Sequence, residues 1–185
     1  MQVVNLHKLD YDGSQLQHAF VYKKAGILGP TIAIFRGAAD VKDHLVDLED
    51  KLANDFIKSA DMWHFIIEIP GATITEAVAL QRLFICLCIE MLSQINNNVT
   101  YTRKGDDIIV NDKKLSVSIA TLSRFSALIH VGINVTVGDD CPVEAIGLSD
   151  FVSPSLISIF GIGVARAFEA EYNDIKNATY KVTMV

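Results

Sequence analysis

Two adjacent lysines, Lys113 and Lys114, stand where a polar turn gives way to an apolar strand, in the stretch RKGDDIIVNDKKLSVSIA of residues 103–120. A positive charge held at such a point can neutralise a carboxylate and a phosphate that react with each other. Because neighbouring side chains of a strand point to opposite faces, Lys114 is the candidate catalytic residue, and Lys113 is expected to point away. The alternative for Lys114 is a solvated turn lysine beside Asp112.

Two aspartates and an arginine have side chains suited to a nucleotide or an acid. Asp106 and Asp107 could hold a ribose hydroxyl, orient Lys114 or help to bind a metal, and the alternative is a pair of turn residues that bond their own backbone. Arg36 ends an apolar stretch beside Gly37 and could clamp a phosphate or carboxylate with two hydrogen bonds. Its alternative is a structural ion pair with the acidic segment that follows.

A metal site is the weaker interpretation of a second group of residues. The spacing of Asp40, His44 and Asp47 would place two carboxylates and an imidazole on one helical face, which can hold a divalent metal. An acid-rich helix is more often simply solvated, so no metal site is predicted. His64 alternates with Phe65 in an apolar stretch and is interpreted as a core residue.

The elements that must position these residues are predicted to form one α+β domain over residues 1–185. Thr73 and Glu76 form a capping box before an apolar helix over 74–95. A second helix of about 20 residues is expected from Ser153, in keeping with its helical spacing. The predicted central sheet is mixed and largely antiparallel, and its strands are residues 31–36, 63–69, 107–110, 114–121 and 127–135. The acidic stretch 40–59 has helical spacing, and a short last strand is expected over 180–185.

Composition limits the class of protein. The net charge of −6 disfavours nonspecific nucleic-acid binding. The longest apolar run, residues 83–89, is far shorter than the roughly 20 residues of a membrane span, and no signal peptide is visible. Three cysteines, two of them inside an apolar helix, argue against a disulfide framework and for the cytoplasm.

The order of these elements resembles the catalytic core of the biotin protein ligases, whose class II synthetase-like fold lipoate ligases and octanoyl transferases share. The resemblance rests on three motifs in order: the corner Lys104-Gly105-Asp106-Asp107, then Lys114, then Gly132-Ile133-Asn134-Val135. It covers residues 31–136 and implies that Gly132 and Asn134 contact the ligand. A family known only as a domain of unknown function with this fold is a closer match, through YDGSQL, FRG, HLVDLED, KLSVSIAT and IHVGINV.

The resemblance implies an enzyme that acts on a small carboxylic acid through an acyl-adenylate, with ATP and Mg²⁺ as cofactors. An acceptor protein and a homodimer are the further partners it suggests. Two departures favour the alternative of a non-catalytic binding module on the same fold. A single arginine, Arg36, stands where the ligases have an arginine-rich loop, and Val117 stands where they have a glycine.

The octanoyl transferases suggest a third function, a cysteine-dependent acyltransferase. Their acyl-accepting cysteine follows the strand that resembles residues 127–135, and Cys141 comes seven residues after Asn134. His130 loosely matches the histidine of that strand, with a shortened spacing. Neighbouring acidic residues would raise the pKa of the thiol, which weakens a nucleophile; they are Asp139, Asp140 and Glu144.

Overall fold

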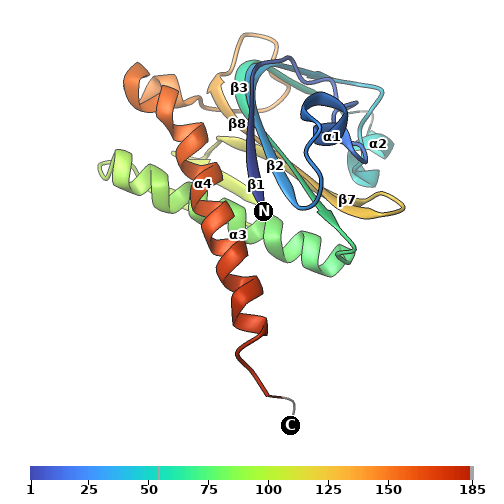
Figure 1. Ribbon diagram of the computed structural model, residues 1–185. Coiled ribbons are helices and arrows are strands. Elements are labelled where there is room, and N and C mark those ends of the chain that lie inside the picture. The colour runs from blue at the N-terminus through green and yellow to red at the C-terminus, as the bar shows by residue number, and fades with distance from the viewer. Residues whose placement is uncertain (54, 184–185) are drawn as a thin grey trace.

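The structure is a computed structural model that describes residues 1–53 and 55–183. Its main feature is a five-stranded sheet in the order β1-β2-β3-β8-β7 (Figure 1). The strands are β1 (Gln2–Lys8), β2 (Thr31–Val41), β3 (Ile57–Pro70), β8 (Ser126–Thr136) and β7 (Ser116–Leu122). Only β1 and β2 run parallel, so the sheet is mixed and largely antiparallel, as predicted.

Two long helices, α3 (Ile74–Ile95) and α4 (Pro154–Thr179), cover one face of this sheet (Figure 1). The capping box predicted at Thr73 and Glu76 is present, and α3 spans the predicted residues. Phe84 of α3 packs between Phe65 of β3, with ring centroids 4.8 Å apart, and Phe168 of α4, at 5.2 Å. By length and composition alone α3 could cross a membrane, but its inward face is buried against the sheet and α4.

The opposite face of the sheet is covered by shorter elements. These are α1 (Phe20–Ala25), α2 (Leu48–Ala53) and the chain around Tyr11 and Leu45 (Figure 1). Side chains alternate across each strand, so from Met62 onward the even-numbered residues of β3, like those of β8, face this side, and the odd-numbered ones face α3 and α4. An irregularity between Asp61 and Met62 reverses this order at the start of β3, where Ile57 faces this side. The helix α2 buries none of its residues, which leaves the region beside it free to hold cavities.

A second, three-stranded sheet corrects one prediction. Its strands are β4 (Tyr101–Lys104), β5 (Asp107–Val110) and β6 (Lys113–Lys114), so residues 107–110 and Lys114 do not belong to the central sheet with Gly132. Asn111 and Asp112 both have positive φ and form the tight two-residue turn between β5 and β6. Leu115 then switches sheets, because its N–H bonds to Ile108 of β5 and its carbonyl to Asn134 of β8.

Two local predictions also needed correction, and one strand was missed. Residues 40–59 are not one helix: β2 ends at Val41, β3 begins at Ile57, and only α2 lies between them. The predicted strand over 180–185 is absent from 180–183, since α4 continues to Thr179, and residues 184–185 lie outside the described part. The edge strand β1 had no clear sequence signal. A 3₁₀ turn over Leu148–Asp150 precedes α4.

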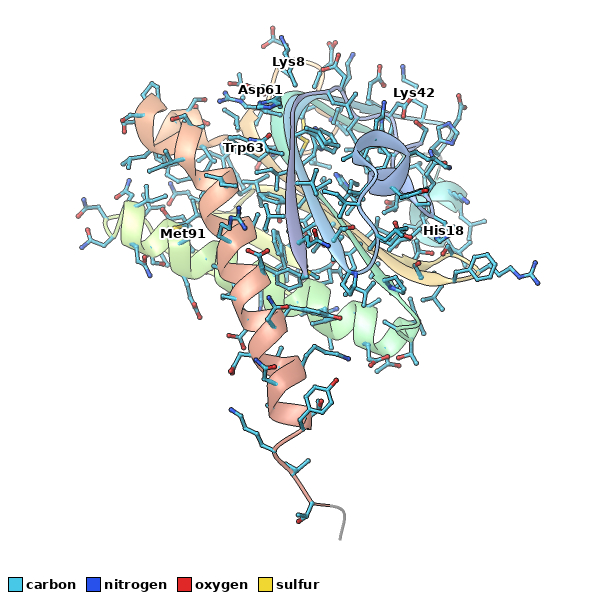
Figure 2. All side chains as sticks on the ribbon, viewed as in Figure 1. Lys8, His18, Lys42, Asp61, Trp63 and Met91 are labelled. Carbon is cyan, nitrogen blue, oxygen red and sulfur yellow. The ribbon has the colours of Figure 1, made fainter. Side chains whose placement is uncertain are left out.

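The buried carboxylate of Glu68 fastens α1 to the sheet. It accepts hydrogen bonds from His18 Nδ1 at 2.8 Å, from Ser126 Oγ at 2.9 Å and from the Ala19 backbone N–H at 3.0 Å. Figure 2 shows His18 at the end of the sheet far from Lys8 and Asp61. The three donors come from two separate parts of the chain, so this one side chain holds them together.

We expect Glu68→Gln to lower the free energy of unfolding by roughly 1–2 kcal/mol, because an amide has one acceptor oxygen where the carboxylate has two. Urea unfolding monitored by circular dichroism measures the change. The exposed Glu90→Gln on α3 is the matched control and should change the value by less than about 0.5 kcal/mol. Equal effects of the two changes would contradict the role given to Glu68.

Candidate functional site

Lys114 is fixed at both its backbone and its side chain. Its N–H donates to the Glu144 carbonyl at 3.0 Å, and its own carbonyl accepts from the Ile146 N–H at 3.1 Å. Its Nζ lies 3.0 Å from Asp107 Oδ1, and both side chains are about one-third exposed. Lys114 is therefore held between the small sheet and the segment before the 3₁₀ turn, and Asp112 is not its partner.

A cavity of about 180 Å³ opens beside Lys114 on the sheet face away from α3 and α4. Asn134, which is 5% exposed, lines the same cavity and donates from Nδ2 to the Lys114 carbonyl at 3.4 Å. An ammonium and an amide thus face one small space. The remaining lining residues are Asp50, Asp55, Phe56, Ile57, Lys58, Ser59, Met62, Ser116, Val117, Ser118, Cys141, Pro142, Val143 and Ala145.

Gly132 does not open onto this cavity as the resemblance implied. A Cβ placed on it would lie 2.6 Å from Met62 Cε and 3.0 Å from Val117 Cγ2, because those two side chains pack over the glycine. The absence of a side chain therefore makes room for Met62 and Val117. These two side chains occupy space on the side of the cavity that faces the sheet, and so they make the cavity narrower.

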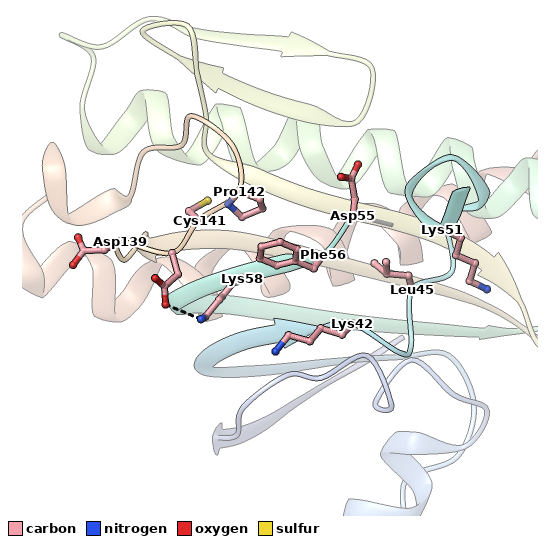
Figure 3. Close-up of a pocket in the computed structure, with 10 residues that line it drawn as sticks. Lys42, Leu45, Lys51, Asp55, Phe56, Lys58, Asp139, Cys141 and Pro142 are labelled. Atoms are coloured by element: carbon pink, nitrogen blue, oxygen red, sulfur yellow. Dashed lines mark hydrogen bonds and ion pairs between the residues drawn. The ribbon is translucent and has the colours of Figure 1, made fainter. Parts of the chain in front are cut away.

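A larger, open cleft of about 870 Å³ adjoins the cavity (Figure 3). Figure 3 shows the Phe56 ring in its middle, with Cys141 and Pro142 on one side and Leu45 on the other. Both spaces are lined by Asp55, Phe56, Lys58, Cys141 and Pro142, so they form one continuous depression. The depression lies beside β3, β8 and the segment before α2.

The cleft has a mixed lining of lysines and aspartates that sequence reasoning missed. Lys42, Lys51 and Lys58 provide three ammonium groups, and Lys58 Nζ lies 2.7 Å from Asp140 Oδ2. This hydrogen bond raises the pKa of Lys58 and lowers the pKa of Asp140. The three lysines are irregularly spaced in a segment dominated by acid, so no sequence pattern marked them.

Arg36 does not share a cleft with Lys114, which corrects the prediction that the two would meet. Its guanidinium forms a paired contact with Asp61, at 2.9 Å and 2.6 Å to Oδ2, and lies 5.9 Å from the Trp63 ring centroid. Figure 2 labels Asp61 and Trp63 near one end of the sheet. Arg36 pairs with Trp63 in register, and both residues point to the α4 side, so alternation along the strand separates Arg36 from Lys114.

Arg36 and Gly37 line a separate open cavity of about 610 Å³ with Lys8 and Asp10. Gly37 is required by close packing, since a Cβ there would collide with the Leu9 carbonyl. The ion pair with Asp61 supports the structural alternative for Arg36, although its partner is Asp61 and not the acidic segment. A ligand-binding role for these two residues stays a prediction.

Asp106 and Asp107 face different parts of the molecule. Asp106 accepts from Gln81 Nε2 of α3 at 2.9 Å and from Ser118 Oγ of β7 at 2.7 Å. It therefore ties the small sheet to the helical side, away from the cavity. Asp107 meets the site only through Lys114, whose ammonium it orients.

The pattern Asp40, His44 and Asp47 does not lie on one helix, because Asp40 belongs to β2 and the other two precede α2. Within residues 1–53 and 55–183, no group of three histidine, cysteine or acidic side chains is placed to hold a metal. Cys141 is a free, partly exposed thiol that lines both the cavity and the cleft. The acyltransferase resemblance suggested Cys141 as a nucleophile, but no prediction placed it in one cavity with Lys114.

A buried pair of histidines lies deeper on the same sheet face. His64 of β3 and His130 of β8 are 0% and 2% exposed, and His64 Nδ1 lies 3.1 Å from His130 Nε2. Burial lowers the pKa of His64 to about 4, and burial together with the neighbouring His64 lowers the pKa of His130. Tyr11 stacks on His130, with ring centroids 3.9 Å apart. Sequence reasoning identified His64 as a core residue but not its partner.

Comparison with known proteins identifies the family to which the sequence is similar. The sequence model described as "Domain of unknown function (DUF366)" matches residues 1–183. An uncharacterised protein of Methanocaldococcus jannaschii is 36% identical over 149 residues, which are 77% of this chain and 66% of that protein. The chain thus spans slightly less than two thirds of that relative's own length.

Solved structures give the same picture. A protein of unknown function from Pyrococcus horikoshi is 37% identical, with a TM-score of 0.90, and the match covers 100% of both chains. A biotin protein ligase from Aquifex aeolicus in complex with biotin is 15% identical, with a TM-score of 0.60 over 94% of this chain and 72% of that one. At that identity the likeness shows the fold alone.

Proposed function

The chain belongs to the family described as Domain of unknown function (DUF366) and has the fold of the biotin and lipoate protein ligases, and from this premise we propose that it acts on a small carboxylic acid. The acid would lie in the 180 Å³ cavity, with its carboxylate between Lys114 and Asn134. The reaction class is ligase-like or acyltransferase-like. The cytoplasm as location, an acceptor protein and a homodimer remain predictions.

One observation carries this proposal: a lysine and a buried asparagine line one cavity at the point where two sheets meet. The ammonium of Lys114 supplies charge for a carboxylate, and the Asn134 side chain carries an amide group for a further hydrogen bond. Asp107 lowers the conformational freedom of Lys114 without filling the cavity. A preorganised charge of this kind stabilises charge that develops during acyl transfer.

The volume and the lysines of the adjoining cleft support ATP as the second substrate in this proposal. Its volume of about 870 Å³ exceeds that of the acid cavity, and Lys42, Lys51 and Lys58 line it. ATP would supply the adenylyl group: a carboxylate oxygen of the acid bonds to the α-phosphorus, and the bond to pyrophosphate breaks. Lys114 and Lys58 both line the acid cavity, and Lys58 also lines the cleft. Their ammonium groups would balance the negative charge of the carboxylate and the phosphates during this adenylyl transfer. Aspartates of the cleft, such as Asp55 and Asp139, would accommodate Mg²⁺ together with the phosphates.

Cys141 supports a second candidate, a cysteine-dependent acyltransferase. It lines the acid cavity together with Lys114, so an acyl group held there would reach its Sγ. The narrowing of the cavity by Met62 and Val117 supports the other alternative, a binding module without catalysis. These three functions differ in what they do with a bound acid.

Three measurements separate the ligase, the binding module and the acyltransferase. Thermal melting of the protein is measured with octanoate, lipoate and biotin, each with and without ATP and Mg²⁺. A ligand at about 100 times its dissociation constant adds about 2.7 kcal/mol to stability, which is easily detected. Acid-dependent exchange of labelled pyrophosphate into ATP would identify the ligase reaction. Binding without exchange would identify the binding module. An acyl adduct on Cys141, detected by mass spectrometry after incubation with an octanoyl thioester whose thiol leaves as the cysteine is acylated, would identify the acyltransferase. Failure of every acid to raise the melting temperature would overturn the proposal.

A further inference from the structure

A small pocket of about 60 Å³ lies at the inner end of the acid cavity. The two spaces are both lined by Asp50, Ile57, Val117 and Ser118, so the small pocket continues the larger one along the sheet. Its volume holds a polar group of a few atoms. Tyr11 and His130 line it, and neither contributes to the part of the cavity around Lys114.

The hydrogen bonds of the histidine pair determine which ring nitrogen of His130 carries the hydrogen and which one has no hydrogen-bond partner within the pair. The Gly37 carbonyl can only accept, so His64 Nε2, 3.2 Å away, carries the hydrogen. His64 Nδ1 must then accept from His130 Nε2. Since burial keeps both rings neutral at pH 7, His130 Nδ1 carries no hydrogen and is an acceptor.

Two polar atoms are thereby left without a partner. Among the described residues, neither His130 Nδ1 nor Tyr11 Oη forms a protein hydrogen bond, although the two residues are 2% and 4% exposed. Every fully enclosed side-chain nitrogen or oxygen in the described part has a partner, so these two atoms must keep some contact with open space. The 60 Å³ pocket, which both residues line, provides that space.

We propose that this pocket recognises the far end of the substrate and selects acids whose tail carries an uncharged donor group, a hydroxyl or a carboxamide. The tail would donate to His130 Nδ1 and accept from the Tyr11 hydroxyl. This inference rests on the proposed function, because it assumes that the carboxylate lies at Lys114. An apolar tail would leave both buried atoms unsatisfied, which costs affinity.

The spacing along β8 sets the length of such a substrate. Asn134 and His130 lie on the same sheet face and are four residues apart, about 13 Å at 3.3 Å per residue. A straight acid of about eight carbons with a terminal hydroxyl or carboxamide spans most of this length. The stacked rings of Tyr11 and His130 hold the recognition atoms in place at the inner end.

The test compares octanoate with 8-hydroxyoctanoate and with the monoamide of octanedioic acid, by calorimetric titration of the full chain. We expect the wild type to bind the hydroxy acid and the amide about 10- to 100-fold more tightly than octanoate. Tyr11→Phe keeps the stacked ring and has no protein hydrogen bond to lose. His130→Gln keeps a donor for His64 Nδ1. Each variant should reduce the preference for the hydroxy acid and the amide over octanoate by about tenfold, because it removes one of the two recognition atoms.

The outcomes separate this inference from the proposed function. If the wild type binds all three acids equally, selection by the inner pocket is overturned and acid binding stands. An unchanged preference in both variants also overturns it, since the recognition atoms would then lie elsewhere. If no acid binds at all, the proposed function fails and this inference fails with it.

Discussion

Replacing Lys114 by alanine is expected to abolish acid-dependent pyrophosphate exchange, with a loss of about 10²–10³ in rate. The reason is that Lys114 lines the cavity together with Asn134, whereas Lys42 and Lys51 line only the neighbouring cleft. Lys58 lines both spaces, but its ammonium is paired with Asp140. The fold should survive. The ion pair with Asp107 is about one-third exposed, so its loss lowers the free energy of unfolding by at most about 1 kcal/mol.

Lys113→Ala is the matched control, because Lys113 precedes Lys114 on the same short strand and is exposed. It removes an equal charge from the same surface region and should leave exchange and ligand-dependent melting unchanged. The test acid is one that stabilises the wild type. If the Lys114→Ala variant binds this acid as tightly as the wild type does, Lys114 is a structural partner of Asp107 and has no part in binding.

The second expected result is a loss of stability in mild acid. His64 and His130 have pKa values below that of a free histidine, so between about pH 6.5 and 4 the unfolded chain binds protons that the folded chain does not. Stability must therefore fall as the pH falls through this range, and it is unaffected by these groups above it. For His64, with a folded-state pKa of about 4, the loss between pH 6.5 and pH 5 is about 1.5 kcal/mol, and His130 adds to it in the same direction.

Urea unfolding at pH 6.5 and pH 5 measures this loss. The double variant His64→Gln and His130→Gln can keep the hydrogen bonds to the Gly37 carbonyl and between the pair, but it does not titrate. Most of the acid-induced loss should vanish in this variant. His7→Asn, at an exposed position with positive φ that asparagine tolerates, should retain the wild-type loss. An equal loss in wild type and double variant would show that other groups cause it.

The elements with strong local signals were predictable from the sequence. The capping box at Thr73 marked the start of α3, and the apolar stretches 63–69 and 127–135 marked the strands β3 and β8, which are buried on both faces. The small sheet was not predictable, because the break at Leu115 depends on hydrogen bonds to two strands that lie far apart in the sequence. In the sequence, residues 114–121 read as one uninterrupted strand. The same pattern would be expected whether or not the residues before and after Leu115 belong to the same sheet.

The site was predicted in part for the same reason. Lys114, Asn134 and Cys141 line the same cavity, since Leu115, which follows Lys114, bonds to Asn134 of β8, and Cys141 comes shortly after that strand. Arg36 was misplaced because a residue type and a strand end do not reveal which face the side chain takes. That face follows from the register with Trp63, and register is a tertiary property. The positions of the three cleft lysines depend on how the end of β2, the helix α2 and the start of β3 pack together, and no local sequence pattern predicts this packing.

The switch at Leu115 has an evolutionary consequence. The N–H of Leu115 bonds to Ile108 and its carbonyl to Asn134, so the position of the preceding residue, Lys114, is set by main-chain contacts that any residue except proline can make. Mutations can accumulate in the surrounding loops without displacing the ammonium. Descendants of one ancestral protein can in this way change what the cavity accepts while the charge keeps its place.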